Sequence, residues 1–211
     1  MKLYLSLEKC YNTNYLSFKE QYWRKIMFIQ TEETPNPATL KFLPGQTVLG
    51  TGTANFSDGD NTESSPLAKK LFGVDGVVGV FLGSDFITIT KKEDFLWEHI
   101  KPALLGTIMD FLQSGEQILN EESGDSSEDV HEGPDSETVK KIIDLLDTRV
   151  RPAVAQDGGD ITFQSFEEGV VYLHMQGACA GCPSSTMTLK MGIENLLKHY
   201  IPEVNEVRPV A

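Results

Sequence analysis

A long stretch without positive charge divides the sequence into two parts. No lysine or arginine occurs between Lys101 and Lys140, and ten acidic residues lie in that interval. Within it, residues 121–136 are rich in serine and glycine and contain one hydrophobic residue, Val130. Such a segment cannot bury enough apolar surface to offset the entropy cost of ordering it. We therefore expect an acidic flexible linker over residues 116–134, with a small domain on each side.

Composition excludes several classes of protein. The 211 residues carry 18 Lys+Arg against 31 Asp+Glu, which gives a formal net charge of −13, and 40% of them are hydrophobic. This supply of apolar residues is enough for two cores. So acidic a surface repels phosphate backbones, and we expect no nucleic-acid partner. Because no run approaches about 18 uncharged apolar residues, we expect no membrane partner either.

Residues 1–26 are predicted to lie outside the fold. They carry five basic residues but no apolar core and no small-residue cleavage site, so we do not expect a secretory signal. With a single arginine, Arg24, they also make a poor mitochondrial presequence. A simpler hypothesis is that translation begins at Met27. We therefore expect a bacterial cytoplasmic protein, with the mitochondrial matrix as the alternative.

The first domain, residues 27–115, is predicted to be a small α+β unit. Ser65 before a proline, with Gly73 at the other end, is typical of a helix with both ends capped. Apolar residues at three- and four-residue steps predict a second helix over residues 97–115. This domain has no cysteine and a lone histidine, His99, so we expect a partner-binding or regulatory module. Short apolar runs between turn signals predict strands at 28–31, 39–43, 77–82 and 86–90.

The second domain, residues 135–211, is predicted to have the order α-β-β-α-β. Apolar residues at helical spacing indicate a first helix that starts at Ser136 and ends or bends near Pro152. A second helix follows Pro183, with an apolar face that runs to Tyr200. Together the elements form one layer of helices on a sheet, giving an α+β fold. The three strands are expected at 161–166, 170–175 and 204–207.

Two of the three cysteines, Cys179 and Cys182, form a Cys-x-x-Cys pair between the second strand and the second helix of this domain. Proline is preferred in a first helical turn, so Pro183 places Cys182 at or near the N-cap. Unpaired backbone N–H groups there favour thiolate over thiol. With small and turn-forming neighbours, the pair is predicted to be an exposed dithiol of lowered pKa. We expect replacement of either cysteine by alanine to leave the domain folded.

The number of ligands limits what this pair can bind. A closed zinc site or a cubane cluster takes about four protein ligands, and the domain has two thiols. His174 and His199 would complete a zinc site on paper, but each falls on the polar face of its element, so we expect both to face solvent. Four ligands are also available if two chains share one iron–sulfur cluster across a twofold axis. A cluster held at such an interface can be given away, which favours a carrier over an enzyme. A thiol–disulfide oxidoreductase and a structural zinc module stay open.

Two motifs resemble those of a known family. Asp-Gly-Gly-Asp-Ile at residues 157–161 and Gly-Ala-Cys-Ala-Gly-Cys-Pro-Ser-Ser at 177–185 are similar to the C-terminal domain of NifU, in the Nfu-type iron–sulfur scaffold family. Residues 31–42, Thr-Glu-Glu-Thr-Pro-Asn-Pro-Ala-Thr-Leu-Lys-Phe, resemble the N-terminal domain that accompanies it. The resemblance implies a homodimer that assembles or carries a [4Fe–4S] cluster on Cys179 and Cys182 of two chains. It also implies partners: an upstream cluster assembly machinery, and apo-proteins such as lipoyl synthase or aconitase-type enzymes that receive the cluster.

Overall fold

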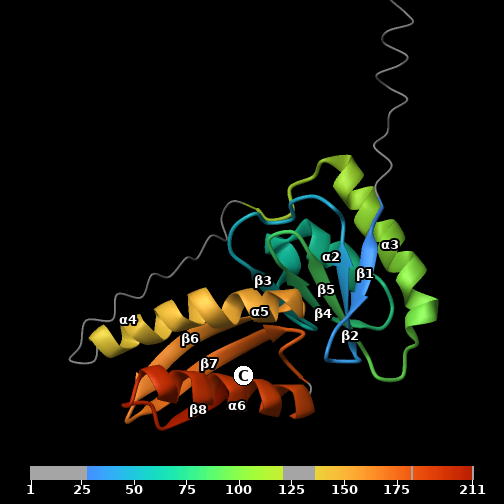
Figure 1. Cartoon of the computed structure of the whole chain (residues 1–211). Helices are drawn as coiled ribbons and strands as arrows, with labels where there is room; N and C mark the ends of the chain where they lie inside the picture. Colours follow the sequence, from blue (N-terminus) through green and yellow to red (C-terminus); the bar gives the residue numbers. More distant parts are fainter. Residues whose placement is uncertain (1–27, 121–135, 182, 211) are drawn as a thin grey trace, which may run out of the picture.

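The computed structural model describes residues 28–120, 136–181 and 183–210, and the structural statements below concern these residues. Two sheets, each with its own helices, make up the described part of the chain (Figure 1). This confirms the predicted α+β class with two small domains. Residues 1–26, Cys182 and linker residues 121–134 lie outside the described residues. The linker and the exact domain boundaries therefore stay predictions.

The first domain is a five-stranded antiparallel sheet with two helices packed against it. Its strand order is β1-β2-β5-β4-β3, and all four neighbouring pairs are antiparallel. The bounds are β1 (Gln30–Glu33), β2 (Thr39–Leu43), β3 (Ala54–Ser57), η1 (Thr62–Ser64), α2 (Pro66–Phe72), β4 (Val77–Leu82), β5 (Ile87–Lys91) and α3 (Trp97–Ser114).

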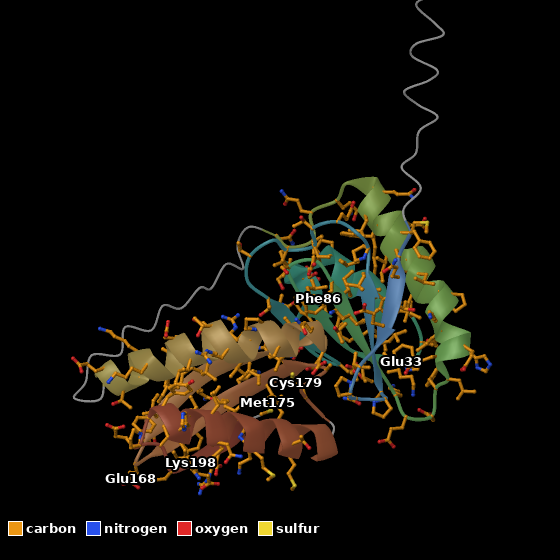
Figure 2. The ribbon with its side chains drawn as sticks, viewed as in Figure 1. Glu33, Phe86, Glu168, Met175, Cys179 and Lys198 are labelled. Atoms are coloured by element: carbon orange, nitrogen blue, oxygen red, sulfur yellow. The ribbon has the colours of Figure 1, made fainter. Side chains whose placement is uncertain are left out.

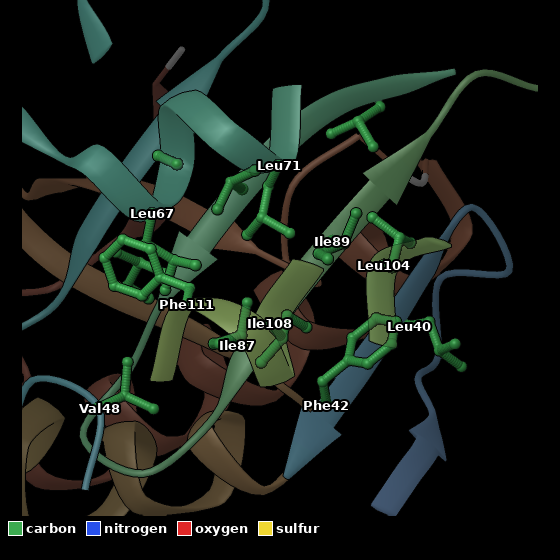
Figure 3. Packing of buried hydrophobic residues seen from close by; sticks show 14 of the residues in the cluster. Leu40, Phe42, Val48, Leu67, Leu71, Ile87, Ile89, Leu104, Ile108 and Phe111 are labelled. Atoms are coloured by element: carbon green, nitrogen blue, oxygen red, sulfur yellow. The ribbon is translucent and has the colours of Figure 1, made fainter. Parts of the chain in front are cut away.

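Alternate strand residues of this sheet point toward α2 and α3 and form the first core (Figure 3). Because side chains on a strand alternate between the two faces, the intervening residues point to the opposite face of the sheet. The opposite face carries Lys41 of β2, Thr88 of β5 and Phe81 of β4. The buried residues on the helix side include Leu40, Phe42, Ile87, Ile89, Leu104, Ile108 and Phe111.

The helix ends of the first domain follow the sequence closely, whereas its first and third strands do not. The Ser65 hydroxyl accepts a hydrogen bond from the backbone N–H of Ala68, which confirms the predicted cap of α2. β1 starts at Gln30 rather than at Phe28, because pairing with β2 begins there and Phe28 is exposed. β3 was not predicted at all. Only Phe56 of its four residues is buried, so the apolar signal in the sequence is too short to predict a strand.

The second domain has the predicted α-β-β-α-β order. Its sheet has the order β6-β7-β8, with β6 antiparallel and β8 parallel to β7. Val171, Leu173 and Met175 of β7 are buried in the second core, as their alternation predicts. The bounds are α4 (Ser136–Leu145), the π-helical turn η3 (Leu146–Val150), α5 (Arg151–Gln156), β6 (Gly159–Glu167), β7 (Val170–Gly177), α6 (Pro183–Tyr200) and β8 (Glu206–Val210).

One expectation for the helices of this domain holds in part and one is wrong. The first helix does not stop near Pro152, but its segments change there, because the π-helical turn ends at Val150 and α5 runs from Arg151 to Gln156. Proline is tolerated because a new helical segment begins just before it, and a missing N–H costs little in a first turn. Tyr200 is 48% exposed, and Leu197 and Ile201 fill the core in its place. None of the described helices combines the length and apolarity needed to cross a membrane.

Candidate metal-binding site

The loop that carries the cysteines joins β7 to α6, and we call its described residues, 177–181, the cysteine loop. Helix α6 begins at Pro183, as predicted. The backbone N–H of Cys179 donates to the carbonyl of Gln176 at 3.3 Å, and that of Ala180 to the carbonyl of Gly177 at 3.1 Å. The Thr186 hydroxyl donates to the carbonyl of Cys179 at 3.2 Å. These bonds fold the loop into a tight turn and tie it to the start of α6.

Cys179 is buried and does not present its sulfur to solvent. Its exposed fraction is 5%, and it is part of the second hydrophobic core. A Cβ added to Gly159 would lie 2.5 Å from the Cys179 sulfur, so the sulfur occupies the space that a side chain at residue 159 would fill. The predicted exposed dithiol is therefore wrong for Cys179. Cys179 belongs to the second core, and the expectation that its replacement by alanine leaves the domain folded stays a prediction.

The electrostatics of Cys179 also differ from the prediction. Burial raises the pKa of its thiol from 9.0 to about 12, and the negative charges of Asp157 and Asp160 add to this effect. A buried thiolate would lose its hydration and lie near two carboxylates, so the neutral thiol is favoured. The predicted lowered pKa is wrong for Cys179 in this arrangement.

The histidines of the second domain do not join the cysteine loop. His174 is half-buried on β7, between two core residues, and His199 is exposed near the end of α6. Across residues 28–120, 136–181 and 183–210, no three His, Cys, Asp or Glu side chains come close enough together to hold a metal ion. The described part of one chain therefore contains no complete metal site.

An ion pair that the sequence did not reveal supports the strand beneath Cys179. Arg151 of α5 donates from Nε and Nη2 to the two carboxylate oxygens of Asp160, at 2.8 and 2.9 Å. The side chain of Asp160 is 5% exposed and also accepts the backbone N–H of Ile161. These hydrogen bonds hold the pKa of Arg151 above its usual value. β6 starts at Gly159, two residues before the start of the strand expected at 161–166.

Comparison with known proteins decides the family. One family model, described as "Scaffold protein Nfu/NifU N terminal", matches residues 29–115, and another, "NifU-like domain", matches residues 142–208. "NifU-like protein 5, mitochondrial" of Arabidopsis thaliana is 51% identical over 188 residues, covering 87% of this chain and 68% of that protein. The chain belongs to the Nfu/NifU family.

Other Nfu/NifU relatives agree with this placement. "NFU1 iron-sulfur cluster scaffold homolog, mitochondrial" of Drosophila sechellia is 55% identical over 188 residues, covering 89% of this chain. The chain spans 66% of the length of that relative. A solution structure of a NifU-like protein from Saccharomyces cerevisiae is 29% identical and covers 45% of this chain and 86% of that one. The TM-score between the two structures is 0.42.

These relatives bear on the expected compartment. Those from Drosophila sechellia and Arabidopsis thaliana are both named as mitochondrial. The bacterial cytoplasm, our first expectation, finds no support among them.

The buried thiol of Cys179 is expected to make this Nfu/NifU chain less stable at alkaline pH. Below about pH 9 both the native and the unfolded thiol are protonated, so Cys179 contributes no pH dependence. Above that pH the unfolded state loses the proton while the native state keeps it, and the free energy of unfolding falls. We expect urea midpoints to show that the reduced chain loses about 1 kcal/mol more stability than Cys179→Ala between pH 8 and pH 10. Equal losses in the two proteins would contradict the raised pKa.

Proposed function

We propose that this chain is an iron–sulfur cluster scaffold or carrier and not an enzyme. The observation that carries the proposal is a Cys-x-x-Cys loop placed directly before α6 within a NifU-like domain. Relatives at 51–55% identity that are named as iron–sulfur scaffolds or NifU-like proteins support it. The cluster is then a cargo that the chain receives and passes on.

We assign the cluster ligands to Cys179 and Cys182 of two chains, which share one [4Fe–4S] cluster in a homodimer. The two thiols of the Cys-x-x-Cys pair are half of what a cubane cluster takes, and among the described residues of one chain no three possible ligands lie together. A twofold axis that brings the cysteine pairs of two chains together supplies all four ligands. The domain layout we propose has an N-terminal domain at 27–115, a linker at 116–134 and the cluster-binding domain at 135–211.

The buried position of Cys179 adds a step to cluster binding. Its sulfur packs against Gly159, so it has to move away from β6 before a second chain can share a metal with it. The structure therefore describes a conformation suited to the cluster-free chain.

The partners follow from the same proposal. An upstream assembly machinery supplies the cluster, and apo-proteins such as lipoyl synthase or aconitase-type enzymes accept it. The mitochondrial names of the relatives support the mitochondrial matrix as the site of this exchange. A net charge of −13 does not favour nucleic acid as a further partner.

Anaerobic reconstitution with iron and sulfide tests the proposal. We expect a brown dimer with about four iron atoms per two chains, and a Mössbauer spectrum of a [4Fe–4S] cluster. Cys182→Ser and Cys179→Ser should each lose the bound iron, whereas Cys10→Ser, outside both family matches, should keep it. A colourless monomer, or a loaded single chain with all ligands from within itself, would overturn the shared-cluster proposal. Rapid insulin reduction that Cys179→Ser abolishes would instead favour a thiol–disulfide oxidoreductase.

A further inference from the structure

Buried polar side chains mark a contact between the two domains. Six polar or charged residues are buried in the described part of the chain, and four of them take part in hydrogen bonds between domains. The two charged residues among the six, Lys41 and Asp160, are both in that group. Burial of a charge is costly unless the charge is paired, so these bonds identify a specific contact. The four residues are Asn36, Lys41, Thr88 and Asp160.

Lys41 and Thr88 of the first domain hold the turn that precedes β6. They are directly opposite each other in the register of β2 and β5, so both point away from the first core. The Lys41 ammonium donates to the carbonyls of Ala155 and Gln156 at 3.2 and 2.8 Å, at the C-terminal end of α5. The Thr88 hydroxyl donates to the carbonyl of Gly158 at 2.7 Å. A positive charge at the end of a helix where carbonyls are unpaired is favourable.

Two more residues of the first domain contact the cysteine loop itself. The Asn36 side-chain amide donates to the carbonyl of Ala180, between the two cysteines, at 3.0 Å. Phe81 of β4, next to Thr88 in register, lies so close to Gly177 that a Cβ there would be 2.9 Å from its ring. Figure 2 shows Cys179 on the side of the second domain that faces the first. The cysteine loop therefore lies between Gly159 on one side and the first domain on the other.

This arrangement restricts the movement that cluster binding needs. Movement of the cysteine loop would carry the Cys179 sulfur away from Gly159, and the loop is held by Asn36 and Phe81. Lys41 and Thr88 hold the neighbouring turn, whose Gly158 carbonyl accepts the backbone N–H of Ala178 at 3.2 Å. The contacts from the first domain thus reach the turn before β6 and the end of β7, at which the cysteine loop begins.

We propose that Asn36, Lys41, Phe81 and Thr88 are positioning residues that form a removable cover, holding the cysteine loop closed in the cluster-free chain and releasing it for cluster exchange. The closed state stands on the contacts above, and its link to cluster exchange rests on the proposed function. The cover gives the first domain a role that its lack of cysteines left open. Release separates the domains while each keeps its own core, because Lys41, Thr88 and Phe81 lie outside the first core.

The first test measures access to Cys179 in the cluster-free full-length chain. Lys41→Glu places a carboxylate against the carbonyls of Ala155 and Gln156, so we expect it to open the cover. Iodoacetamide labelling of Cys179, followed by peptide mass spectrometry, should become about tenfold faster or more. Thr88→Val removes one hydrogen bond at nearly constant volume and should give a smaller increase. Lys69→Glu makes the same charge change at an exposed site of the first domain and should leave the rate unchanged.

A second readout separates an open cover from an unfolded domain. Small-angle X-ray scattering of Lys41→Glu should show a larger radius of gyration, while circular dichroism shows unchanged secondary structure. Labelling of Cys179 at the same rate in Lys41→Glu, Thr88→Val and Lys69→Glu would overturn the cover. Iron binding by the unaltered chain is measured separately. Failure to bind iron would reject the proposed function and leave the labelling result standing, whereas iron binding with unchanged labelling would reject the cover alone.

Discussion

Arg151→Met is expected to destabilise the protein by about 3 kcal/mol, the lower end of the cost of breaking a buried ion pair. The substitution removes the two hydrogen bonds to Asp160 and leaves a carboxylate that is 5% exposed without its positive partner. We take the lower end because the Arg151 side chain itself is 37% exposed. Urea denaturation, followed by circular dichroism, measures the loss.

Two further variants control this result. Arg149→Met removes an exposed arginine from the same run of helical residues. Its guanidinium packs on the ring of Tyr200 and has no buried carboxylate partner among the described residues, so the loss of stability should be much smaller. Asp160→Asn added to Arg151→Met removes the unpaired charge and should recover part of the stability. Equal midpoints for Arg149→Met and Arg151→Met would show that the pair does not stabilise the fold.

Gly159→Ala is expected to cost about 2–3 kcal/mol through overpacking. The new methyl group would lie 2.5 Å from the Cys179 sulfur, 2.7 Å from the Gln176 carbonyl oxygen and 2.9 Å from the Cys179 backbone nitrogen. Two of these atoms belong to the backbone, which cannot move aside as a flexible side chain would. The sulfur should be displaced as well, so thermal unfolding should shift downward and Cys179 should be alkylated faster.

Gly192→Ala is the matched control for this prediction. Gly192 lies within α6 of the same domain, and nothing lies within 4 Å of an added Cβ there. Because alanine is favoured over glycine inside a helix, this variant should be neutral or more stable by about 0.5–1 kcal/mol. A loss of stability equal to that of Gly159→Ala would mean that the crowding around Cys179 is not the cause.

The elements that could be predicted from sequence are those with local signals. Helix α2 has Ser65 and Gly73 at its ends, and β7 alternates core and outward residues along its length. The strand β3 could not be predicted, since it is an edge strand with a single buried residue, Phe56, and depends on pairing with β4. The continuation of the helix through Pro152 depends on a π-helical turn that leaves no pattern in the spacing of apolar residues.

The candidate site shows the same division. The place of the Cys-x-x-Cys pair before α6 follows from Pro183 and the neighbouring glycines. The burial of Cys179 does not, because it depends on Gly159, a residue on another strand that only the pairing of β6 with β7 brings close. Lys41 stands between Leu40 and Phe42 in a pattern typical of a strand with one face in water. No short stretch of the sequence shows that a second domain covers the outer face of this strand.

The π-helical turn at Leu146–Val150 has a consequence for how this chain tolerates deletions. A turn of this kind accommodates one residue more than a regular α-helix does. Because the turn absorbs that residue locally, removing one residue there would regularise the helix and leave the segments on either side at nearly the same rotation. Arg151 would then still face Asp160. The same deletion in the regular helix α4 would turn everything after it by about 100°, the step between successive helical residues, so the chain should tolerate the loss of a residue better in this turn than in α4.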